Sequence, residues 1–397
     1  MRVYQVNVVC GSGSTGRIAA DLAQTIHEHG GESRIAYGRG DAPAGIDAVK
    51  ISNKLDLYVH AMLTRLTDKH GLYSRNATKR LIKDIKEYNP DIIHLHNIHG
   101  YYVNYEMLFE FLGDYNRPIV WTLHDCWTFT GHCAHFDYVR CKKWKNKCHE
   151  CPQKGIYPRS ILRDNSTENF ERKQKAFNMP ENMTIVTVSD WLKGVVEQGI
   201  LQRYPVKRIY NGINLELMHP VENELRVKYQ LEDKKIVLGV ASIWDERKGL
   251  YTFYDLAKYL PEEYQFVLIG LNEKQLDKNP ENIFGIQKIA SPKELAKWYT
   301  VADVYVNTSV EETMGMTTVE AMACGTPVVV MNTTGSPELV YEGCGESVEP
   351  GNVAQLIDVI QNMKKTEKTM KCCLDRANDF EKSKQYNKYI QLYRKLL

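Results

Sequence analysis

The stretch ADVYVNTSVEETMGMTTVEAMACGTPVVV, residues 302–330, holds the strongest fold signal in this chain. Its ends, ADVYVNTS and TPVVV, are short β-branched runs typical of buried parallel strands, and TTVEAMACG between them is typical of a helix. Glu312 and Glu320 stand eight positions apart across a flexible Met-Gly-Met turn. Thr317 and Glu320 fit a capping box that closes a helix N-terminus. The alternative interpretation is a ligand-binding loop at the carboxyl end of a parallel strand.

Length and composition favour a soluble protein of two domains. At 397 residues the chain is long for one core and suits two domains of roughly 200 residues each. No stretch approaches the ~18 apolar residues of a spanning helix, and the first residues, MRVYQVNVVC, lack the apolar region of a signal peptide. We therefore expect a cytoplasmic protein. Its net charge of +2 is too small for a nucleic-acid-binding surface.

Short apolar runs alternate with helical patterns in both halves of the chain. VYQVNVV, SRIAYG, DIIHLHN, PIVWTLHD and MTIVTVSD read as strands of the first half, and KIVLGVA, YQFVLIG, DVYVNTS and TPVVVMN as strands of the second. Such alternation predicts α/β domains with parallel sheets and helices on both faces. The segment YPVKRIYNGINLELMHP, with its Asn-Gly and Pro residues, predicts a connector. Two doubly wound domains would face a cleft lined by the carboxyl ends of their strands.

The first loop, GSGSTGR, matches G-x-G-x-x-G at Gly11, Gly13 and Gly16, between a strand and a helix. A dinucleotide fingerprint also needs an acid at the end of the second strand, where this chain has Tyr37 and Arg39. An NADP-linked oxidoreductase could use Arg39, so that hypothesis stays open. Without a defined cofactor, the loop still offers backbone N–H groups to an anion.

A pair of cations, Arg247 and Lys248, lies in ASIWDERKGL between a predicted strand and a predicted helix. Two cations at such a place could neutralise a diphosphate, because charge-assisted hydrogen bonds exceed neutral ones. A solvated turn of alternating charges is the other interpretation.

Taken together, these segments resemble the retaining GT-B glycosyltransferases, in particular family 4. EETMGMTTVEAMACGTPVVV resembles the E-x7-E segment of that family, with Glu312 and Glu320 in register. GSGSTGR resembles its Gly-rich loop, WTLHDCW the strand end that carries its active-site His, and RKGL its diphosphate Lys. VSDW, YNGIN, TTGSPELV and SVEPGN follow in the family's order, so the resemblance covers residues 11–352.

The resemblance implies a role for each matched residue. Glu320 is expected to hydrogen-bond ribose hydroxyls, Glu312 to contact donor-sugar hydroxyls, and Lys248 to bind the diphosphate. His124 is expected at the donor sugar near the reacting centre, so the candidate catalytic residues are His124, Glu312 and Lys248. The remaining candidate donor-binding residues supply backbone N–H groups or charge, and they are Gly16, Arg247, Gly315, Met316 and Thr317.

Two positions depart from the family pattern. Ser242 stands where the family usually carries an Arg about six residues before the Lys, and we expect Arg247 to supply that charge. TMGM at residues 313–316 replaces the more usual GFG, so the sugar pocket is expected to differ in shape.

The final segment, FEKSKQYNKYIQLYRKLL, has Tyr386, Tyr389, Ile390 and Tyr393 at helical spacing. It is either a closing helix on the second domain or, as the resemblance implies, a crossover back to the first. We therefore expect an acceptor-side domain of residues 1–205 plus 381–397, with a cysteine-rich insertion at 126–152. A nucleotide-sugar-binding domain of residues 206–380 would complete the chain.

The function that the resemblance implies is transfer of a sugar, with retained configuration, from a UDP- or GDP-linked donor to a glycan or lipid-linked glycan in cell-surface polysaccharide biosynthesis. Front-side attack by the acceptor needs no protein nucleophile and no catalytic metal or cofactor. A catalytically silent GT-B protein that binds a partner is the non-enzyme alternative, beside the NADP-linked oxidoreductase.

The cysteine-rich insertion carries the last hypothesis. Cys133, Cys141, Cys148 and Cys151 end in a C-x-x-C pair, which favours a structural zinc site over reduced thiols or disulfides. His132, His135 and His149 are substitute ligands. The lysine-rich run at residues 140–154 could face an anionic membrane surface, so peripheral association with the inner face of the membrane is a further expectation. A solvated loop is the alternative.

Overall fold

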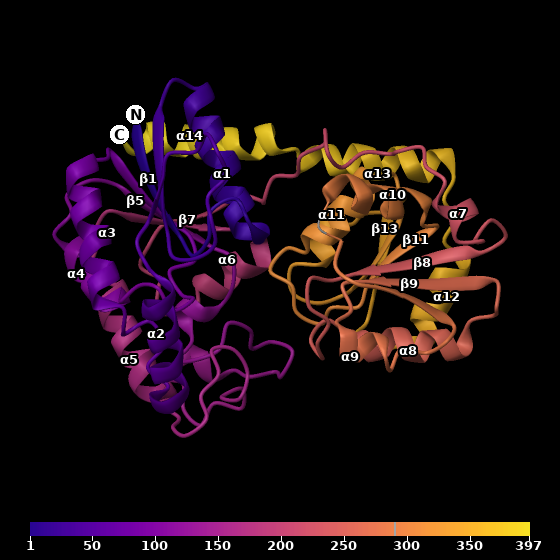
Figure 1. Ribbon diagram of the computed structural model, residues 1–397, viewed down its shortest axis with the longest axis horizontal. Coiled ribbons are helices and arrows are strands. Elements are labelled where there is room, and N and C mark those ends of the chain that lie inside the picture. Colours follow the sequence, from indigo (N-terminus) through magenta and orange to yellow (C-terminus); the bar gives the residue numbers. More distant parts are fainter. Residues whose placement is uncertain (290) are drawn as a thin grey trace. The chain divides into compact units, whose positions relative to one another are not determined.

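The computed structural model describes residues 1–289 and 291–397 (Figure 1). The chain forms two compact units. Unit 1 consists of Met1–Tyr210 and Tyr386–Leu397, and unit 2 consists of Asn211–Gln385. Each unit is built on its own parallel sheet, with helices packed against both faces, and is described by itself.

Unit 1 contains a seven-stranded sheet in the order β3-β2-β1-β4-β5-β6-β7. Every strand pair described in it is parallel. The strands are β1 Arg2–Asn7, β2 Glu32–Tyr37, β3 Ala48–Lys50, β4 Ile92–Leu95, β5 Ile119–Leu123, β6 Met183–Thr187 and β7 Val206–Arg208. The helices are α1 Gly13–Glu28, α2 Lys54–Thr67, α3 Arg75–Tyr88, α4 Tyr105–Gly113, α5 Ser166–Phe177 and α6 Asp190–Val196, with short 3-10 helices at Trp127–Phe129 and Lys143–Lys145.

The last helix, α14 Lys382–Leu396, packs into the core of unit 1. Its buried Tyr386, Tyr389 and Tyr393 share one hydrophobic cluster with side chains of β1, β4, β5, β6 and α1. The Tyr389 hydroxyl lies 3.0 Å from Thr122 Oγ1, and the Tyr393 hydroxyl lies 2.6 Å from His94 Nδ1. Residues 386–397 of this helix are therefore part of the packed core of unit 1.

Unit 2 contains a six-stranded sheet in the order β10-β9-β8-β11-β12-β13. Its strands are β8 Lys235–Val240, β9 Tyr264–Ile269, β10 Ile283–Ile286, β11 Val304–Asn307, β12 Val328–Met331 and β13 Gly345–Val348, in parallel pairs. The helices are α7 Leu225–Lys228, α8 Leu250–Tyr259, α9 Glu273–Leu276, α10 Pro292–Val301, α11 Met316–Ala323, α12 Val353–Asn362 and α13 Glu367–Asp379, with a 3-10 helix at Pro337–Leu339. In Figure 1, α8 and α12 lie on one face of this sheet and α10, α11 and α13 on the other.

Both sheets reverse their strand order at one place, between β1 and β4 in unit 1 and between β8 and β11 in unit 2. In doubly wound folds, ligands bind outside the carboxyl ends of the strands at such a switch point. The Gly-rich loop and residues 96–101 follow β1 and β4, and the Arg247–Lys248 turn and the Glu312 loop follow β8 and β11. The predicted α/β fold with two Rossmann-like sheets is confirmed.

The structure adds elements that the sequence patterns did not predict. Strands β3, β7, β10 and β13 are edge or near-edge strands of three or four residues, too short for a periodic signal. Strand β7 begins at Val206, just after the predicted domain boundary, and pairs with β6 of unit 1. Helices α2 and α3 were also unassigned. Among the described residues, no helix is both long enough and apolar enough to cross a membrane.

Candidate functional site

In unit 2, two turns at the switch point have backbone shapes that require glycine. Gly249 has a φ of +72° and precedes α8, and an added Cβ would lie 2.6 Å from the Thr308 carbonyl oxygen. Gly315 has a φ of +83° and precedes α11. A side chain is strained in this left-handed region, so the sequence places glycine there. The two turns are held together, because the Thr308 hydroxyl donates to the Lys248 carbonyl oxygen at 2.8 Å.

Lys248 and Glu312 form an ion pair between these two turns. Their side chains are only 19% and 12% exposed. Burial alone would raise the pKa of the Glu312 carboxyl, but Lys248 and Arg247 outweigh it and lower that pKa. The Arg247 guanidinium also donates to the Glu311 carbonyl oxygen at 2.8 Å. The structure thus brings together the two predicted cations and the predicted sugar-binding acid, although Lys248 and Glu312 are 64 residues apart in sequence.

Glu320 and Thr317 each have a tyrosine partner at the start of α11. The Tyr299 hydroxyl donates to Glu320 Oε2 at 2.9 Å, and the Tyr305 hydroxyl donates to Thr317 Oγ1 at 2.7 Å. The helix begins at Met316 after Gly315, with no side-chain cap. The capping-box interpretation of Thr317 and Glu320 is therefore wrong, because Thr317 lies one residue inside the helix rather than before it. Both tyrosines are buried and were not predicted as site residues.

In unit 1, the Gly-rich loop closes tightly on α1. The Gly11 N–H donates to the Gly16 carbonyl oxygen at 2.9 Å, although Gly16 already belongs to the helix. A Cβ on Gly16 would lie 2.9 Å from the Val9 side chain. Gly16 therefore allows a close approach of α1 to the loop that follows β1, and it lies in unit 1 whereas the other predicted donor-binding residues lie in unit 2.

His124, which follows β5, belongs to a row of imidazole rings. His124 Nε2 lies 3.2 Å from His96 Nδ1, with the two rings stacked at 18°. His96 Nε2 lies 3.0 Å from Gln5 Oε1, and the ring centres of His94 and His96 lie 4.1 Å apart. Burial, reinforced by His99 and opposed by Asp125, lowers the pKa of His124 to about 4. A ring with this lowered pKa is uncharged at neutral pH and can still donate and accept hydrogen bonds.

Beside His124, three side chains form a second hydrogen-bonded row. Asp125 Oδ2 lies 2.7 Å from His99 Nε2, and His99 Nδ1 lies 2.9 Å from the Tyr157 hydroxyl. Burial would raise the pKa of Asp125, but the His99 ring outweighs it and lowers that pKa to about 2. The Trp127 N–H supports the same carboxyl at 2.9 Å. His96, His99 and Asp125 follow strands β4 and β5, so the strand-end rule that selected His124 could have selected them.

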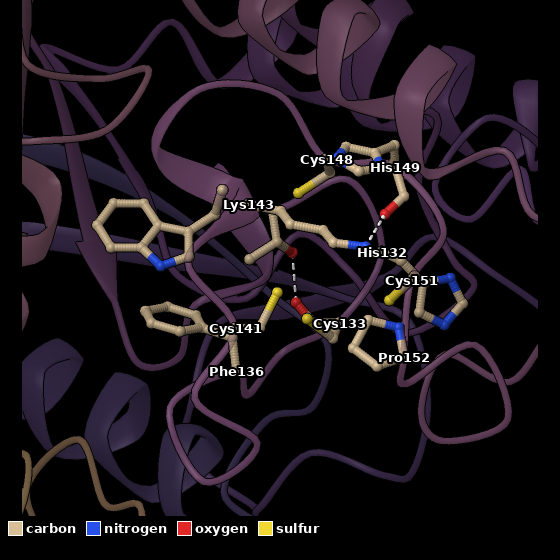
Figure 2. Close-up of a pocket in the computed structure, with 11 residues that line it drawn as sticks. His132, Cys133, Phe136, Cys141, Lys143, Cys148, His149, Cys151 and Pro152 are labelled. Atoms are coloured by element: carbon tan, nitrogen blue, oxygen red, sulfur yellow. Dashed lines mark hydrogen bonds between the residues drawn. The ribbon is translucent and has the colours of Figure 1, made fainter.

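The structure gives no support for the predicted zinc site in the cysteine-rich insertion. Among residues 1–289 and 291–397, no group of three or more His, Cys, Asp or Glu side chains is arranged to hold a metal ion. A cavity of about 10 Å³ lies among the predicted ligands, at the lower limit for one water molecule (Figure 2). It is lined by side chains that include His132, Cys133, Cys141, Cys148, His149 and Cys151.

Hydrogen-bonded thiols and an aromatic cluster pack together within this segment. The Gly131 N–H donates to Cys148 Sγ at 3.2 Å, and the Cys133 thiol hydrogen-bonds to the Cys151 sulfur, which lowers the pKa of Cys151. The buried rings of Phe129, Phe136 and Trp144 pack against one another beside the sulfurs. These rings give the insertion a small apolar core of its own.

Lys173, from α5, fastens the beginning of the insertion. Its ammonium donates to the Trp127 and Thr130 carbonyl oxygens at 2.6 and 2.9 Å, and it lies 3.5 Å from the centre of the Trp127 ring. Burial lowers the pKa of Lys173 to about 7. The same stretch of backbone carries Asp125. Lys173 therefore helps to hold the segment that follows β5 in place.

The family models match both units. Residues 15–217 match the model described as Glycosyltransferase Family 4, which is more than half of the chain. The chain belongs to glycosyltransferase family 4. Residues 234–365, which contain Lys248, Glu312 and Glu320, match the model described as Glycosyl transferases group 1. Membership of this family favours the glycosyltransferase hypothesis over the NADP-linked oxidoreductase.

Two individual relatives each match less than half of this chain. The chain is 30% identical over 172 residues to the "Putative colanic acid biosynthesis glycosyl transferase WcaC" of Escherichia coli (strain K12), covering 40% of this chain and 41% of the relative. It is 26% identical over 207 residues to the N,N'-diacetylbacillosaminyl-diphospho-undecaprenol alpha-1,3-N-acetylgalactosaminyltransferase of Campylobacter jejuni, covering 47% and 53%. The chain thus spans about half the length of these relatives.

A solved structure of the same fold covers the whole chain. Alr3699/HepE of Anabaena, determined in complex with UDP-glucose, superposes with a TM-score of 0.69 at 16% identity and covers 100% of both chains. At this identity the likeness concerns the fold, which is GT-B. This family 4 chain therefore combines a GT-B fold with a cationic, carboxylate-bearing loop in unit 2 and a histidine-rich strand edge in unit 1.

Proposed function

We propose that this family 4 chain is a retaining glycosyltransferase that moves a hexose from a nucleoside-diphosphate donor to a hydroxyl of a glycan or lipid-linked glycan. The Lys248–Glu312 pair at the unit 2 switch point, with Arg247 beside it, is the observation that carries the proposal. Cell-surface polysaccharide biosynthesis is the proposed setting, supported by the printed names of the Escherichia coli and Campylobacter jejuni relatives.

Lys248 and Arg247 are the proposed diphosphate ligands. Both are fixed by neighbours before any donor arrives: Lys248 by Glu312, and Arg247 by the Glu311 carbonyl oxygen. Cations held in place at a poorly solvated site stabilise developing negative charge without reorganising. The first N–H groups of α11, at Met316 and Thr317, add the positive end of a helix dipole.

Glu320 and Glu312 are the proposed hydroxyl ligands. An ionised carboxylate accepts several hydrogen bonds, so Glu320 would accept from the ribose hydroxyls while the Tyr299 hydroxyl donates to its Oε2. Glu312 would likewise accept from the donor sugar while paired with Lys248. Gly315 has no side chain, so the backbone before α11 would be accessible to the donor beside these two carboxylates.

Unit 1 is the proposed acceptor-side domain, and unit 2 the proposed nucleotide-sugar domain. His124 is proposed to hydrogen-bond the donor sugar as a neutral ring, consistent with its lowered pKa. Because His96 contacts one of its ring nitrogens, His124 is held in one orientation. The proposed role needs that orientation rather than a titrating proton.

In the proposed reaction, the bond from the anomeric carbon to the leaving phosphate oxygen breaks as the acceptor oxygen bonds on the same face. The acceptor proton passes to the departing phosphate, so atoms and charge balance without a protein nucleophile. The protein's share is electrostatic stabilisation by Lys248, Arg247 and the α11 N–H groups.

A thermal-shift panel of UDP-, GDP- and ADP-sugars tests the donor class. A donor present at about 100-fold over its dissociation constant adds ~2.7 kcal/mol to the free energy of unfolding. We expect one nucleotide series to raise the melting temperature, and the Lys248→Ala variant to lose that rise. No shift with any nucleotide sugar, together with a shift on adding NADPH, would support the oxidoreductase.

Product analysis tests the rest of the proposal. With the donor so identified, NMR of the product reports whether the anomeric configuration is retained. Binding of the donor without any transfer to glycan or polyprenyl-diphosphate-linked acceptors would favour the catalytically silent alternative.

A further inference from the structure

Helix α2, Lys54–Thr67 in unit 1, is amphipathic, but it buries a polar face and exposes an apolar one. Its buried residues are His60 and Thr64, both polar. His60 is held by the Ser74 hydroxyl at 2.7 Å and by the Gly71 N–H at 3.0 Å. The large apolar side chains point to solvent instead, and they are Leu55 (69% exposed), Tyr58 (68%), Val59 (38%), Met62 (42%) and Leu66 (41%).

These five residues form one continuous stripe. Their spacing of three and four residues places them on a single face of the helix, opposite His60. The stripe continues onto the segment after the cysteine-rich insertion, because the Ile161 N–H donates to the Arg65 carbonyl oxygen at 2.7 Å. Ile161 and Leu162 are 54% and 67% exposed there. A contiguous exposed apolar patch of this kind marks an interaction surface.

The charged side chains around the stripe that form neither an ion pair nor a hydrogen bond within the described part of the chain are all positive. Exposed Lys54, Arg65, Arg159 and Arg163 form no ion pair with any residue in the described part of the chain. The nearby acids are already satisfied: Asp56 pairs with Arg80 at 2.8 Å, and Glu168 pairs with Lys69 at 3.1 Å.

A third acid, Asp164, accepts from the Cys151 and Ser166 N–H groups. With 3.6 residues per turn, Lys54 and Arg65 fall along one border of the stripe. Apolar residues bordered by free cations suit a surface that is apolar inside and anionic outside.

We infer that α2 and residues 161–162 dock on an anionic phospholipid bilayer, with the stripe inserted at the headgroup level and the four cations facing lipid phosphates. An apolar helix face bordered by Lys and Arg binds membranes in the interface plane in this way. This surface is distinct from the lysine-rich run at residues 140–154, and the inference stands on unit 1 alone, whatever the donor.

Vesicle flotation of the full chain tests the inference. Wild-type protein is expected to float with vesicles of phosphatidylglycerol and phosphatidylethanolamine, and to float much less with phosphatidylcholine alone. Tyr58→Asp/Met62→Asp is expected to weaken the partition coefficient about tenfold or more, because two inserted side chains become charged. Lys54→Glu/Arg65→Glu is expected to abolish the preference for anionic lipid.

The matched control is Tyr251→Asp/Tyr259→Asp on α8 of unit 2, two tyrosines that are each 68% exposed, as Tyr58 is. This variant should bind vesicles as the wild type does. A milder variant, Tyr58→Ser/Met62→Ser, keeps the test valid if the aspartates perturb folding. Nucleotide-sugar binding by calorimetry should be unchanged in every variant, which separates this inference from the proposed function.

Three results would overturn the inference. The first is no flotation of the wild type with anionic vesicles. The second is equal loss of binding in the α8 control. The third is a dimer in sedimentation velocity that Tyr58→Asp/Met62→Asp dissociates, since the stripe would then be an interface between two copies of the chain.

Discussion

The two units share one backbone arrangement but carry different side chains in the loops that follow their strands. Each has an all-parallel sheet with a switch point, and each places its candidate residues in the loops that follow the strands there. Yet eleven of the twelve histidines lie within residues 1–210, and unit 2 contains His219 alone. Unit 2 instead holds two cations against a carboxylate.

This difference shows that the side chains beyond the carboxyl ends of parallel strands can be either ionised or neutral when they are buried. In unit 2, Lys248 and Arg247 lower the pKa of Glu312, so the loop is ionised and suited to a charged ligand. In unit 1, burial lowers the pKa of His94 to about 3 and of His124 to about 4, so the rings stay neutral. Uncharged hydrogen-bonding groups suit hydroxyl-rich ligands, and they make unit 1 sensitive to acid.

The largest expected effect is loss of unit 1 stability in acid. Burial lowers the pKa of fully buried His60 and His94 from 6.5 to about 3, so the unfolded chain binds more protons in this range. Stability is therefore present above about pH 6.5 and lost as the pH falls, by about 1.4 kcal/mol per pH unit for each histidine. Urea unfolding at about pH 7 and about pH 5, followed by proteolysis and mass spectrometry, measures each unit.

One group opposes this loss of stability in acid, and one variant isolates the share of a single histidine. His132, whose pKa is raised by Asp68 against burial, acts in the opposite direction and removes part of the effect. His94→Gln should reduce the pH dependence by one histidine's share. If both units lose equal stability, the contrast between them is broken.

Removing the central cation of unit 2 comes next. Lys248→Ala is expected to lower turnover about 10²- to 10³-fold, because the leaving diphosphate loses a fixed positive charge. The pKa of Glu312 should also rise, since burial is then opposed only by Arg247 and the hydrogen bond to Ser309, and the pH–rate profile should gain an acidic limb. Steady-state kinetics with the donor from the thermal-shift panel checks both.

Lys258→Ala provides the control for this prediction, because Lys258 is an exposed lysine of α8 paired with Asp255. Its turnover should match the wild type. An equally small effect of Lys248→Ala would remove the electrostatic role assigned to the unit 2 loop.

A smaller effect is expected at the start of α11. Glu320→Ala should weaken binding of the free nucleotide by ~1.5–3 kcal/mol, about 10- to 100-fold, because ribose hydroxyls lose a charged acceptor. Tyr299→Phe should cost less, since Glu320 keeps its charge and loses one hydrogen bond. Calorimetry gives both values, and unchanged affinity in Glu320→Ala would show that the residue serves the helix alone.

The smallest expected effect concerns the second row of unit 1. Tyr157→Phe removes the hydroxyl that contacts His99 Nδ1 and leaves the His99–Asp125 pair in place. We expect turnover to fall about tenfold or less, with nucleotide affinity unchanged, because one neutral hydrogen bond is worth about 1 kcal/mol. A loss of nucleotide affinity equal to the loss of turnover would contradict the assignment of this row to the acceptor side.

Much of the fold was predictable from local patterns. The longer buried strands carry continuous β-branched runs, and residues that follow them must lie at the carboxyl edge of a parallel sheet. The same rule selects His124, which directly follows β5, and the loops after β8 and β11 that carry Lys248 and Glu312. The short edge strands β3, β7, β10 and β13 escaped because three or four residues carry no period.

The cysteine-rich insertion shows the limit of motif spacing. The C-x-x-C pair in the sequence favours a metal, but it does not predict that Phe136 and Trp144 line the same small cavity as the four cysteines. Spacing along the chain carries no information on which side chains surround a thiol in space.

By itself, the sequence determined the strand–helix alternation, the glycines of the left-handed turns and the residue types at each strand end, because these depend on neighbours within a few positions. Only the tertiary structure decided which distant groups meet, as Lys248 meets Glu312 and Tyr157 meets His99. It also decided that α2 buries His60 and exposes Tyr58 and Met62. Periodicity defines two faces of a helix, but which face turns inward depends on the groups that the rest of the fold presents to it.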